Sequence, residues 1–285
     1  MITTTALADG SMEAVDYRCE AGASARPFTE RHGAFSVSYV RMGSFGYASR
    51  GRAAELVAGS TLVGCAGDEY VCTHDHVCGD ECLSFQFAPA LAEELDNRHA
   101  TWRIGALPPL PELVVLGELA QAAAEGRRDV GLDEAGLLYA ARVVALARGG
   151  DATPRAATDA GALDRRRAVE AAVWMEENSP DAIDLGTVAG QAGLSRFHFL
   201  RLFSKVLGIT PHQHLVRVRL RRAARLLACD DCSVSEAAFE SGFGDLSNFI
   251  RTFRRAAGVS PRGFRRLAKG DRNILQDRLA SPAVR

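Results

Sequence analysis

One short segment of the chain concentrates side chains that bind transition metals. Cysteine and histidine recur at Cys72, His74, His76, Cys78 and Cys82. Thiolates and imidazoles are ligands of zinc and of other first-row metals. Alternate residues of a strand face one side, so positions 72 to 78 could direct these groups into one cavity. The segment is interpreted as buried or incidental side chains at a barrel rim, with a bound transition metal or a thiol redox sensor as the alternatives.

The length of this segment limits how many of its residues can hold one ion. An extended run from 72 to 78 spans roughly 20 Å, whereas metal–ligand bonds are ~2.0–2.3 Å long. A single site would need a turn near Gly79 or only some of the ligands. No cofactor is therefore assigned with certainty, and a transition metal is a candidate that some of the five residues, or a segment turning near Gly79, could hold.

A second set of residues has the spacing of a nucleic-acid reader. One pattern is written twice, 50 residues apart, at 184–209 and 233–259. Each copy has an alanine four residues before a glycine, then a helix-capping residue, then an Arg-x-Phe pair. The residues are Ala189, Gly193, Ser195, Arg201 and Phe203 in the first copy, and Ala238, Gly242, Asp245, Arg251 and Phe253 in the second. This spacing is typical of a helix-turn-helix, whose second helix enters the major groove of DNA.

The helical phase of each copy separates an inward face from an outward one. In the first copy the predicted inward residues are Phe199, Leu202, Phe203 and Val206, and the outward ones are Arg196, Phe197, Leu200, Arg201 and Ser204. In the second copy the predicted inward residues are Phe249, Ile250 and Phe253, and the outward ones are Ser247, Asn248, Arg251 and Arg255. Arginine can bridge guanine O6 and N7, asparagine can pair with adenine, and phenylalanine can contact a thymine methyl. Serine and arginine could equally bind phosphates, which positions a protein without reading sequence.

Charge is divided unevenly along the 285 residues, although the formal net charge is only −1. Residues 1–160 hold 13 Lys and Arg against 22 Asp and Glu, whereas residues 161–285 hold 21 against 13. The two parts therefore carry about −9 and +8. A basic C-terminal part favours a polyanion partner for that part alone.

The elements that must position these residues differ between the two parts. Residues 30–90 alternate apolar and polar side chains between glycines, which predicts short antiparallel strands in a small β-barrel. After Pro108 to Pro111, two amphipathic helices broken near 126–131 are predicted, either capping the barrel or forming a dimer interface. Residues 151–162 lack a periodic apolar signal and are predicted to be a linker.

The C-terminal part is predicted to be helical from Leu163 onward. A first helix ends near Pro180, and Asp184 caps a short helix that Gly193 terminates. Ser195 caps the next helix, and Pro211 begins a long one. Capping residues begin the two helices of the second copy, and a last helix starts near Pro261. We therefore expect two helix-turn-helix units joined by a long helix.

These residues resemble the AraC/XylS family of transcriptional regulators over about 163–267. The resemblance is carried by the blocks Ser195 to Phe203, Ala223-x-x-Leu226-Leu227, Ala238 to Phe253 and Gly258-Val-Ser-Pro261-x-x-Phe264-Arg265. It implies two recognition helices in successive major-groove segments. By position, Phe197, Leu200 and Arg201 match base-reading sites of the first helix, and Ser247, Asn248 and Arg251 those of the second.

Two positions depart from the family pattern. Leu200 stands where a polar reader is common, so readout by the first helix would depend on apolar contact and on Arg201. Ala237 stands where the family usually has isoleucine, so the second motif is expected to pack more loosely.

The N-terminal half is similar, more distantly, to cupin-type sensor domains. His74-x-His76 followed by Glu81 resembles the metal-binding start of enzymatic cupins, but no second half supplies the remaining histidine. His99 is a candidate for that histidine without further support.

The expected fold class is α+β, with a cupin-like sensor and dimerisation domain at 1–150, a linker at 151–162, a double helix-turn-helix domain at 163–268 and a tail at 269–285.

The expected function is a sequence-specific DNA-binding regulator, not an enzyme, modulated through the N-terminal domain by a small molecule, a metal or a redox signal. Expected partners are double-stranded DNA, an unknown effector, RNA polymerase and a second copy of the chain. No apolar run reaches the ~18 residues of a membrane helix, so a cytoplasmic location is expected. The alternatives are a cupin-type metalloenzyme with an appended helical domain and a nonspecific DNA-binding protein.

Overall fold

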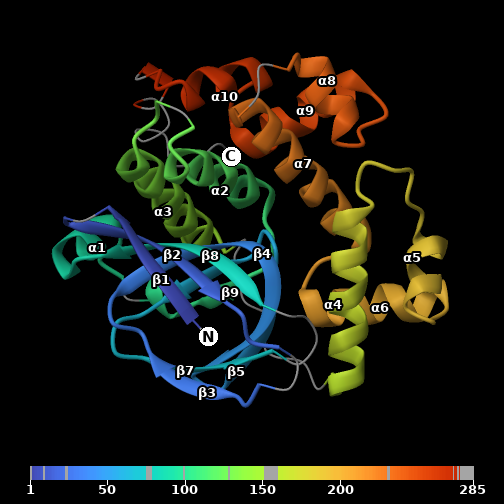
Figure 1. Cartoon of the computed structure of the whole chain (residues 1–285), viewed down its shortest axis with the longest axis horizontal. Coiled ribbons are helices and arrows are strands. Elements are labelled where there is room, and N and C mark those ends of the chain that lie inside the picture. The colour runs from blue at the N-terminus through green and yellow to red at the C-terminus, as the bar shows by residue number, and fades with distance from the viewer. Residues whose placement is uncertain are drawn as a thin grey trace.

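The computed structural model of the chain describes residues 2–8, 10–22, 25–74, 79–98, 100–127, 129–150, 160–229, 232–271, 273–274 and 276. Strands occupy the N-terminal part and helices the C-terminal part, with a pair of helices between them (Figure 1). This arrangement confirms the predicted α+β class.

Antiparallel strands from Ile2 to Leu107 form the N-terminal sheet. In chain order they are β1 (Ile2–Ala8), β2 (Met12–Cys19), β3 (Phe28–Arg31), β4 (Phe35–Ser49), β5 (Arg52–Val57), β6 (Thr61–Gly64), β7 (Glu69–Thr73), β8 (Asp80–Phe87) and β9 (Gly105–Leu107). One path of paired strands runs β1-β2-β8-β4-β6-β9, and β7 pairs with both β3 and β4 while β5 pairs with β4. Because β4 belongs to both sets, it joins two layers of strands.

The sheet bends but does not close among the described strands, so the predicted term barrel describes it only loosely. Among the described strands, the pairing path ends at β1 on one side and at β9 on the other. The first half of β4 pairs with β8 and β6, and its second half pairs with β5 and β7. The register shifts between Val40 and Met42, next to Gly43, which has φ +77°. A bulge bends a strand at such a point, and β4 therefore turns from one layer into the other.

The two helices predicted after Pro108 are α2 (Pro111–Ala124) and α3 (Leu132–Arg148). They follow a short helix α1 (Pro89–Leu95) and a 3-10 turn over Thr101–Arg103. Every residue of α2 from Leu113 to Ala122 is buried. The helix packs on α3 and on helices of the C-terminal part, and it lies between that part and the strands (Figure 1). Helix α2 is thus covered within one chain, whereas Leu137, Ala141 and Ala145 of α3, the helix whose leucine and alanine content suggested a dimer interface, are partly exposed.

The C-terminal helices begin and end close to the predicted positions. They are α4 (Ala162–Glu177), α5 (Leu185–Gln191), α6 (Arg196–Leu207), α7 (Pro211–Cys229), α8 (Val234–Glu240), α9 (Leu246–Ala257) and α10 (Pro261–Ala268). The predicted caps are present: the Asp184, Ser195 and Asp245 side chains accept hydrogen bonds from the backbone N–H groups of Thr187, His198 and Asn248. Ser233 and Glu236 form the predicted capping box. Helices α6 and α9 both end at a left-handed glycine, Gly208 and Gly258.

The two helix-turn-helix units belong to different hydrophobic cores. The first unit, α5 and α6, packs with α4 around Phe199 and Phe203 in a core that also includes Val57 of β5 and Leu215 of α7. The second, α8 and α9, shares one continuous core with α2, α3 and the sheet, in which Phe249 and Phe253 are fully buried. The second unit is therefore joined to the N-terminal part by a continuous core, and the first contacts that part through β5.

Most of the predicted linker and tail lies outside the described residues, as do His76, Cys78 and His99. Helix α4 begins at Ala162, one residue before the expected domain start, and α10 ends at the expected Ala268. No helix in the described ranges combines the length and the apolar character needed to cross a membrane.

Candidate nucleic-acid interface

Helix α6 presents four of its five predicted reading residues to solvent. Arg196, Phe197, Leu200 and Arg201 are exposed, and Phe197 is 70% exposed, which is unusual for a large apolar side chain. The Arg201 guanidinium carbon lies 5.7 Å from the centroid of the Phe197 ring, within the range of a cation–π contact. Phe197 and Arg201 are one helical turn apart, so their side chains form a single exposed unit.

Ser204 does not join this surface. It is half-buried, and its hydroxyl oxygen is covered without a hydrogen-bond partner among the described residues. The inward residues Phe199, Leu202 and Phe203 are buried as the helical phase predicts. The predicted reading residues that α6 exposes are thus Arg196, Phe197, Leu200 and Arg201, and His198 and Lys205 are exposed on the same helix.

Helix α9 presents Ser247, Asn248, Arg251 and Arg255, all of which are exposed. Arg251 donates a hydrogen bond from Nη2 to Oδ1 of Asn248 at 3.1 Å, one helical turn away. This bond leaves the amide nitrogen of Asn248 and the remaining guanidinium donors of Arg251 directed outward from one place on the helix. The arrangement is able to present several hydrogen-bond donors to base edges together.

Ile250 was predicted to face inward, and that prediction is wrong because the side chain is 39% exposed. The buried stripe of α9 is made by Phe249, Phe253, Ala256 and Ala257. Successive residues of a helix are rotated by about 100° around its axis. Ile250 directly follows Phe249 of the buried stripe, so its side chain falls outside that stripe. An apolar side chain therefore borders the polar group of Asn248 and Arg251.

Helix α7 fixes the two units relative to each other through backbone carbonyls. Arg219 donates to the carbonyl oxygens of Ser179 at 2.9 Å and Asp181 at 2.7 Å, in the segment that precedes α5. Arg222 donates to the carbonyl oxygen of Glu240 at 2.9 Å, at the end of α8. One helix thus holds both motifs by charge-assisted hydrogen bonds.

Ala237, where looser packing was expected, is fully buried.

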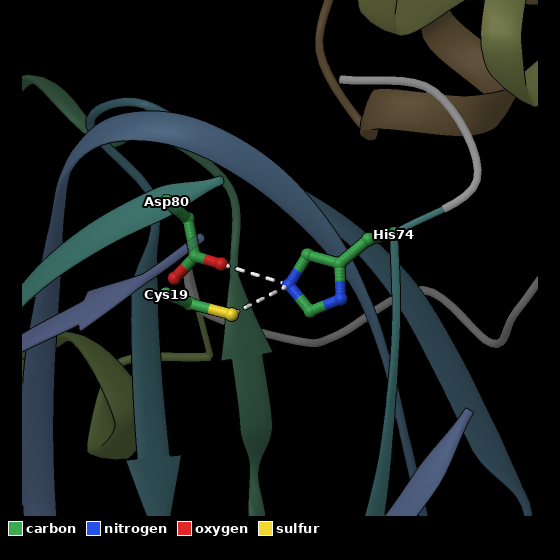
Figure 2. Close-up of side chains that lie close together, drawn as sticks. All are labelled: Cys19, His74 and Asp80. Carbon is green, nitrogen blue, oxygen red and sulfur yellow. Dashed lines mark hydrogen bonds and ion pairs between the residues drawn. The ribbon is translucent and has the colours of Figure 1, made fainter. Parts of the chain in front are cut away.

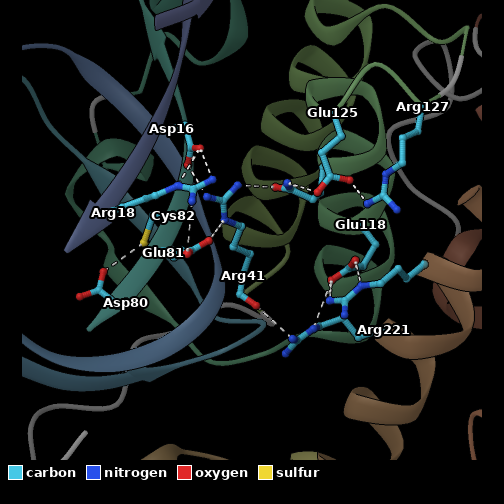
Figure 3. A network of polar contacts seen from close by, with 12 residues as sticks. Asp16, Arg18, Arg41, Asp80, Glu81, Cys82, Glu118, Glu125, Arg127 and Arg221 are labelled. Carbon is cyan, nitrogen blue, oxygen red and sulfur yellow. Dashed lines mark hydrogen bonds and ion pairs between the residues drawn. The ribbon is translucent and has the colours of Figure 1, made fainter. Parts of the chain in front are cut away.

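A buried carboxylate ties α7 to the N-terminal part (Figure 3). Glu118 of α2 is 2% exposed and accepts a hydrogen bond from the Tyr39 hydroxyl of β4 at 2.8 Å. Arg221 and Arg225 of α7 pair with the same carboxylate at 3.2 Å and 2.9 Å. Burial alone would raise the pKa of Glu118, but the charges of Arg225 and Arg221 outweigh it and the pKa lies below its ordinary value.

The contacts continue from α7 into the sheet. Arg221 donates to the backbone carbonyl of Arg41 at 3.0 Å and to Glu176 of α4 at 2.6 Å. The Arg41 side chain pairs with Asp16 of β2 at 2.5 Å and with Glu81 of β8 at 2.8 Å (Figure 3). A chain of polar contacts therefore joins β2 and β8 to the helix that connects the two motifs.

A cavity of about 780 Å³ lies between β4, β5 and β9 on one side and α6 and α7 on the other. Arg217 of α7 lines it, is only 9% exposed, and has an Nη1 atom without a hydrogen-bond partner in the described part of the chain. Burial lowers the pKa of Arg217 to about 10, so the guanidinium is still charged at neutral pH. The cavity is thus bordered by both parts of the molecule and contains a cation with an unused donor.

The cysteine–histidine segment contributes one residue to a compact cluster, and its other two members were not predicted. His74, 3% exposed, lies directly after β7 with its Nε2 3.5 Å from the Cys19 sulfur and 2.9 Å from Oδ2 of Asp80 (Figure 2). Cys19 ends β2 and Asp80 begins β8, and the two residues are paired across these strands. The contact with Cys19 was not predicted, because Cys19 lies far along the chain from the cysteine–histidine segment and no strand was predicted at β2.

The other described residues of the predicted metal site are not among the close ligand atoms of this cluster. Cys82 is buried in β8, and its thiol contacts Oδ1 of Asp80 at 3.7 Å. Cys72 is half-buried in β7, and burial raises its pKa to about 12. Neither belongs to the group of close ligand atoms formed by Cys19, His74 and Asp80. His76 and Cys78 lie outside the described residues.

Comparison with known proteins gives matches over the C-terminal part and over most of the chain. Residues 188–267 match a family model described as a helix-turn-helix domain. The transcriptional activator RhaS of Shigella sonnei is 27% identical over 252 residues, covering 84% of this chain and 87% of the relative. RhaS of Klebsiella pneumoniae is 40% identical over 103 residues, 36% of each chain.

Solved structures also align with the C-terminal part. The DNA-binding domain of AdpA in complex with a target DNA is 34% identical, with a TM-score of 0.36, and the match covers 38% of this chain and 96% of that domain. An AraC-type regulator from Chromobacterium violaceum is 28% identical, with a TM-score of 0.36, over 39% of this chain and 99% of its own.

Proposed function

We infer that this chain is a member of the AraC/XylS family of transcriptional regulators and acts by binding specific DNA sequences. The observation that carries this conclusion is the match of residues 188–267 to a helix-turn-helix domain, within a wider similarity to transcriptional activators. Helices α6 and α9 both expose arginine side chains, and arginine can donate the hydrogen bonds to base edges that such a function requires.

The finer proposal concerns how DNA is read. Helices α6 and α9 enter successive major-groove segments, and α7 sets their spacing through Arg219 and Arg222. The exposed face of α6 would read mainly by apolar contact from Phe197 and Leu200 together with Arg201. The exposed face of α9 would read by hydrogen bonds from Asn248 and Arg251.

Modulation is proposed to occur through the N-terminal part. A small anionic effector would fit the cavity between the sheet and α6 and α7, because Arg217 offers a buried charge and an unused donor there. Such a ligand would contact both parts of the molecule at once. Contact with RNA polymerase and assembly into a homodimer remain predictions, and the partly exposed residues Leu137, Ala141 and Ala145 of α3 are the candidate dimer surface.

Competition between selected and random duplexes tests the proposed function. Duplexes enriched from a random pool by the full-length protein are labelled, and unlabelled random duplex competes at two stated salt concentrations. A sequence-specific regulator retains the selected duplex against a large excess of random DNA at both concentrations. If random DNA competes equally well and the affinity depends only on the salt concentration, the protein is a nonspecific DNA-binding protein instead.

A further inference from the structure

Three strands of the N-terminal sheet bring a thiol, an imidazole and a carboxylate to one point. Cys19, His74 and Asp80 come from the end of β2, the residue after β7 and the start of β8 (Figure 2). Their ligand atoms all lie within 4.8 Å of one another. The three side chains point toward a common centre, and the backbone register of β2 and β8 holds two of them opposite each other.

The spacing of these atoms is close to that of ligands around a tetrahedral zinc ion. Bonds of ~2.3 Å to sulfur and ~2.0–2.1 Å to nitrogen and oxygen place sulfur and nitrogen ~3.5 Å apart, and nitrogen and oxygen ~3.4 Å apart. The Cys19 sulfur lies 3.5 Å from Nε2 of His74, and Oδ2 of Asp80 lies 2.9 Å from the same nitrogen. To match that geometry, the separation of Nε2 of His74 and Oδ2 of Asp80 would need to widen by about half an ångström.

The surroundings of the cluster hold the imidazole in place. The rings of Phe28 and Phe45 have centroids 6.3 Å and 6.4 Å from that of His74, which is buried. The Cys82 thiol donates to Oδ1 of Asp80 and leaves Oδ2 on the side of His74. Apolar walls and a hydrogen-bonded carboxylate are the features that orient metal ligands in proteins.

We propose that Cys19, His74 and Asp80 bind one divalent ion of the zinc class, with a fourth position left for water or an external ligand. A mixed sulfur, nitrogen and oxygen set suits zinc better than magnesium or calcium, which prefer oxygen ligands alone. The site differs from the predicted one, since Cys19 and Asp80 replace Cys72 and Cys82 as partners of His74.

Metal binding by the full-length, untagged protein tests the proposal without reference to DNA. The protein is stripped with a chelator, then titrated with Zn²⁺ and, separately, with Co²⁺ under reducing conditions. We expect one equivalent of either metal, with visible absorption typical of tetrahedral Co²⁺ and a near-ultraviolet band from a cobalt–thiolate bond.

Matched cysteine variants locate the ligands. Cys19→Ser and Asp80→Asn should each bind at least about tenfold more weakly, and Cys19→Ser should lose the thiolate band. Cys72→Ser, which removes a half-buried cysteine of the same region, should bind as the unaltered chain does. Circular dichroism of each metal-free variant confirms that it is folded.

Two results would overturn the proposal. One is less than a tenth of an equivalent of either metal bound by the unaltered protein at micromolar excess. The other is full binding by Cys19→Ser together with lost binding in Cys72→Ser or Cys78→Ser, which would move the ion to the predicted segment. Neither result depends on whether the protein binds DNA, so failure here is distinct from failure of the proposed function.

Discussion

At the scale of residues, the two exposed helix faces offer different chemistry to DNA. On α6 the aromatic ring of Phe197 and the guanidinium of Arg201 lie against each other, beside the apolar Leu200. On α9 Arg251 is bonded to Asn248. Apolar groups distinguish thymine by its methyl, whereas paired donors distinguish guanine and adenine by their acceptors.

Removal of Arg251 tests the role of α9 directly. Arg251→Ala should weaken operator binding by ~1–3 kcal/mol and relax the sequence preference at the bases it contacts. The side chain is exposed and on a helix, so folding should be unaffected. Binding isotherms on the selected operator and on its single-base variants give both quantities.

Arg31→Ala, at an exposed arginine of β3, is the matched control because it removes the same charge far from α9. A variant Arg251→Ala with unchanged affinity and unchanged base preference would exclude this residue from readout.

Phase and capping made most of the reading residues predictable from sequence, and tertiary contacts explain the exceptions. Capping residues fix where α6 and α9 start, which then fixes the side on which each residue lies. Ser204 and Ile250 lie at the edges of the faces, where neighbouring elements decide burial. Cys19 and Asp80 could not be paired with His74, because only strand register brings them together.

At the scale of elements, the helices were predicted better than the strands. Helix boundaries follow from local signals such as Ser233, Gly193 and Pro261. The strands β1 and β2 lie before the predicted region, and the open sheet results from β4 changing partners near Gly43. Pairing between distant strands is set by the whole sheet and has no local signal.

The cavity between the strands and α6 and α7 leads to a prediction about effectors. Small carboxylates that bind there should raise the melting temperature of the protein, because the ligand would supply the partner that Nη1 of Arg217 lacks among the described residues. Arg217→Gln keeps a polar side chain but removes the charge, and it should abolish the shift. A panel of aliphatic and aromatic carboxylates, measured by thermal unfolding, provides the comparison.

Lys205→Gln, at an exposed position that also lines the cavity, controls for general loss of positive charge. Shifts that survive in Arg217→Gln, or that neutral analogues of the same acids produce equally, would contradict an anion site at this residue.

At the scale of the whole molecule, the N-terminal and C-terminal parts form one packed structure. The second helix-turn-helix shares its hydrophobic core with α2 and the sheet. Glu118 is paired with both Arg221 and Arg225 at this junction. The charge division in the sequence indicated two parts, but it did not indicate that an ion cluster joins them.

Replacement of Glu118 tests this junction. Glu118→Gln leaves the buried guanidinium of Arg221 without this partner, which should destabilise the folded protein by ~3–5 kcal/mol. The depressed pKa of Glu118 contributes stability at pH values above the ordinary glutamate pKa, and this contribution is lost as pH falls through the lower, folded-state value. The midpoint of urea unfolding should therefore fall in acid for the unaltered protein, and less steeply for Glu118→Gln.

Glu112→Gln is the control, because Glu112 lies on the same helix and forms a partly exposed pair with Arg142. If Glu118→Gln is no less stable than Glu112→Gln at neutral pH, the junction does not depend on this carboxylate.

The central claim is that α6 and α9 read two adjacent segments of one operator by different chemistry. Selection from a randomised duplex pool with the unaltered protein, Arg201→Ala and Arg251→Ala tests it most directly. The account predicts that each variant loses base preference in one segment only, with the two segments about one helical turn, roughly 10 base pairs, apart. Loss of preference at the same bases in both variants, or in neither, would contradict it.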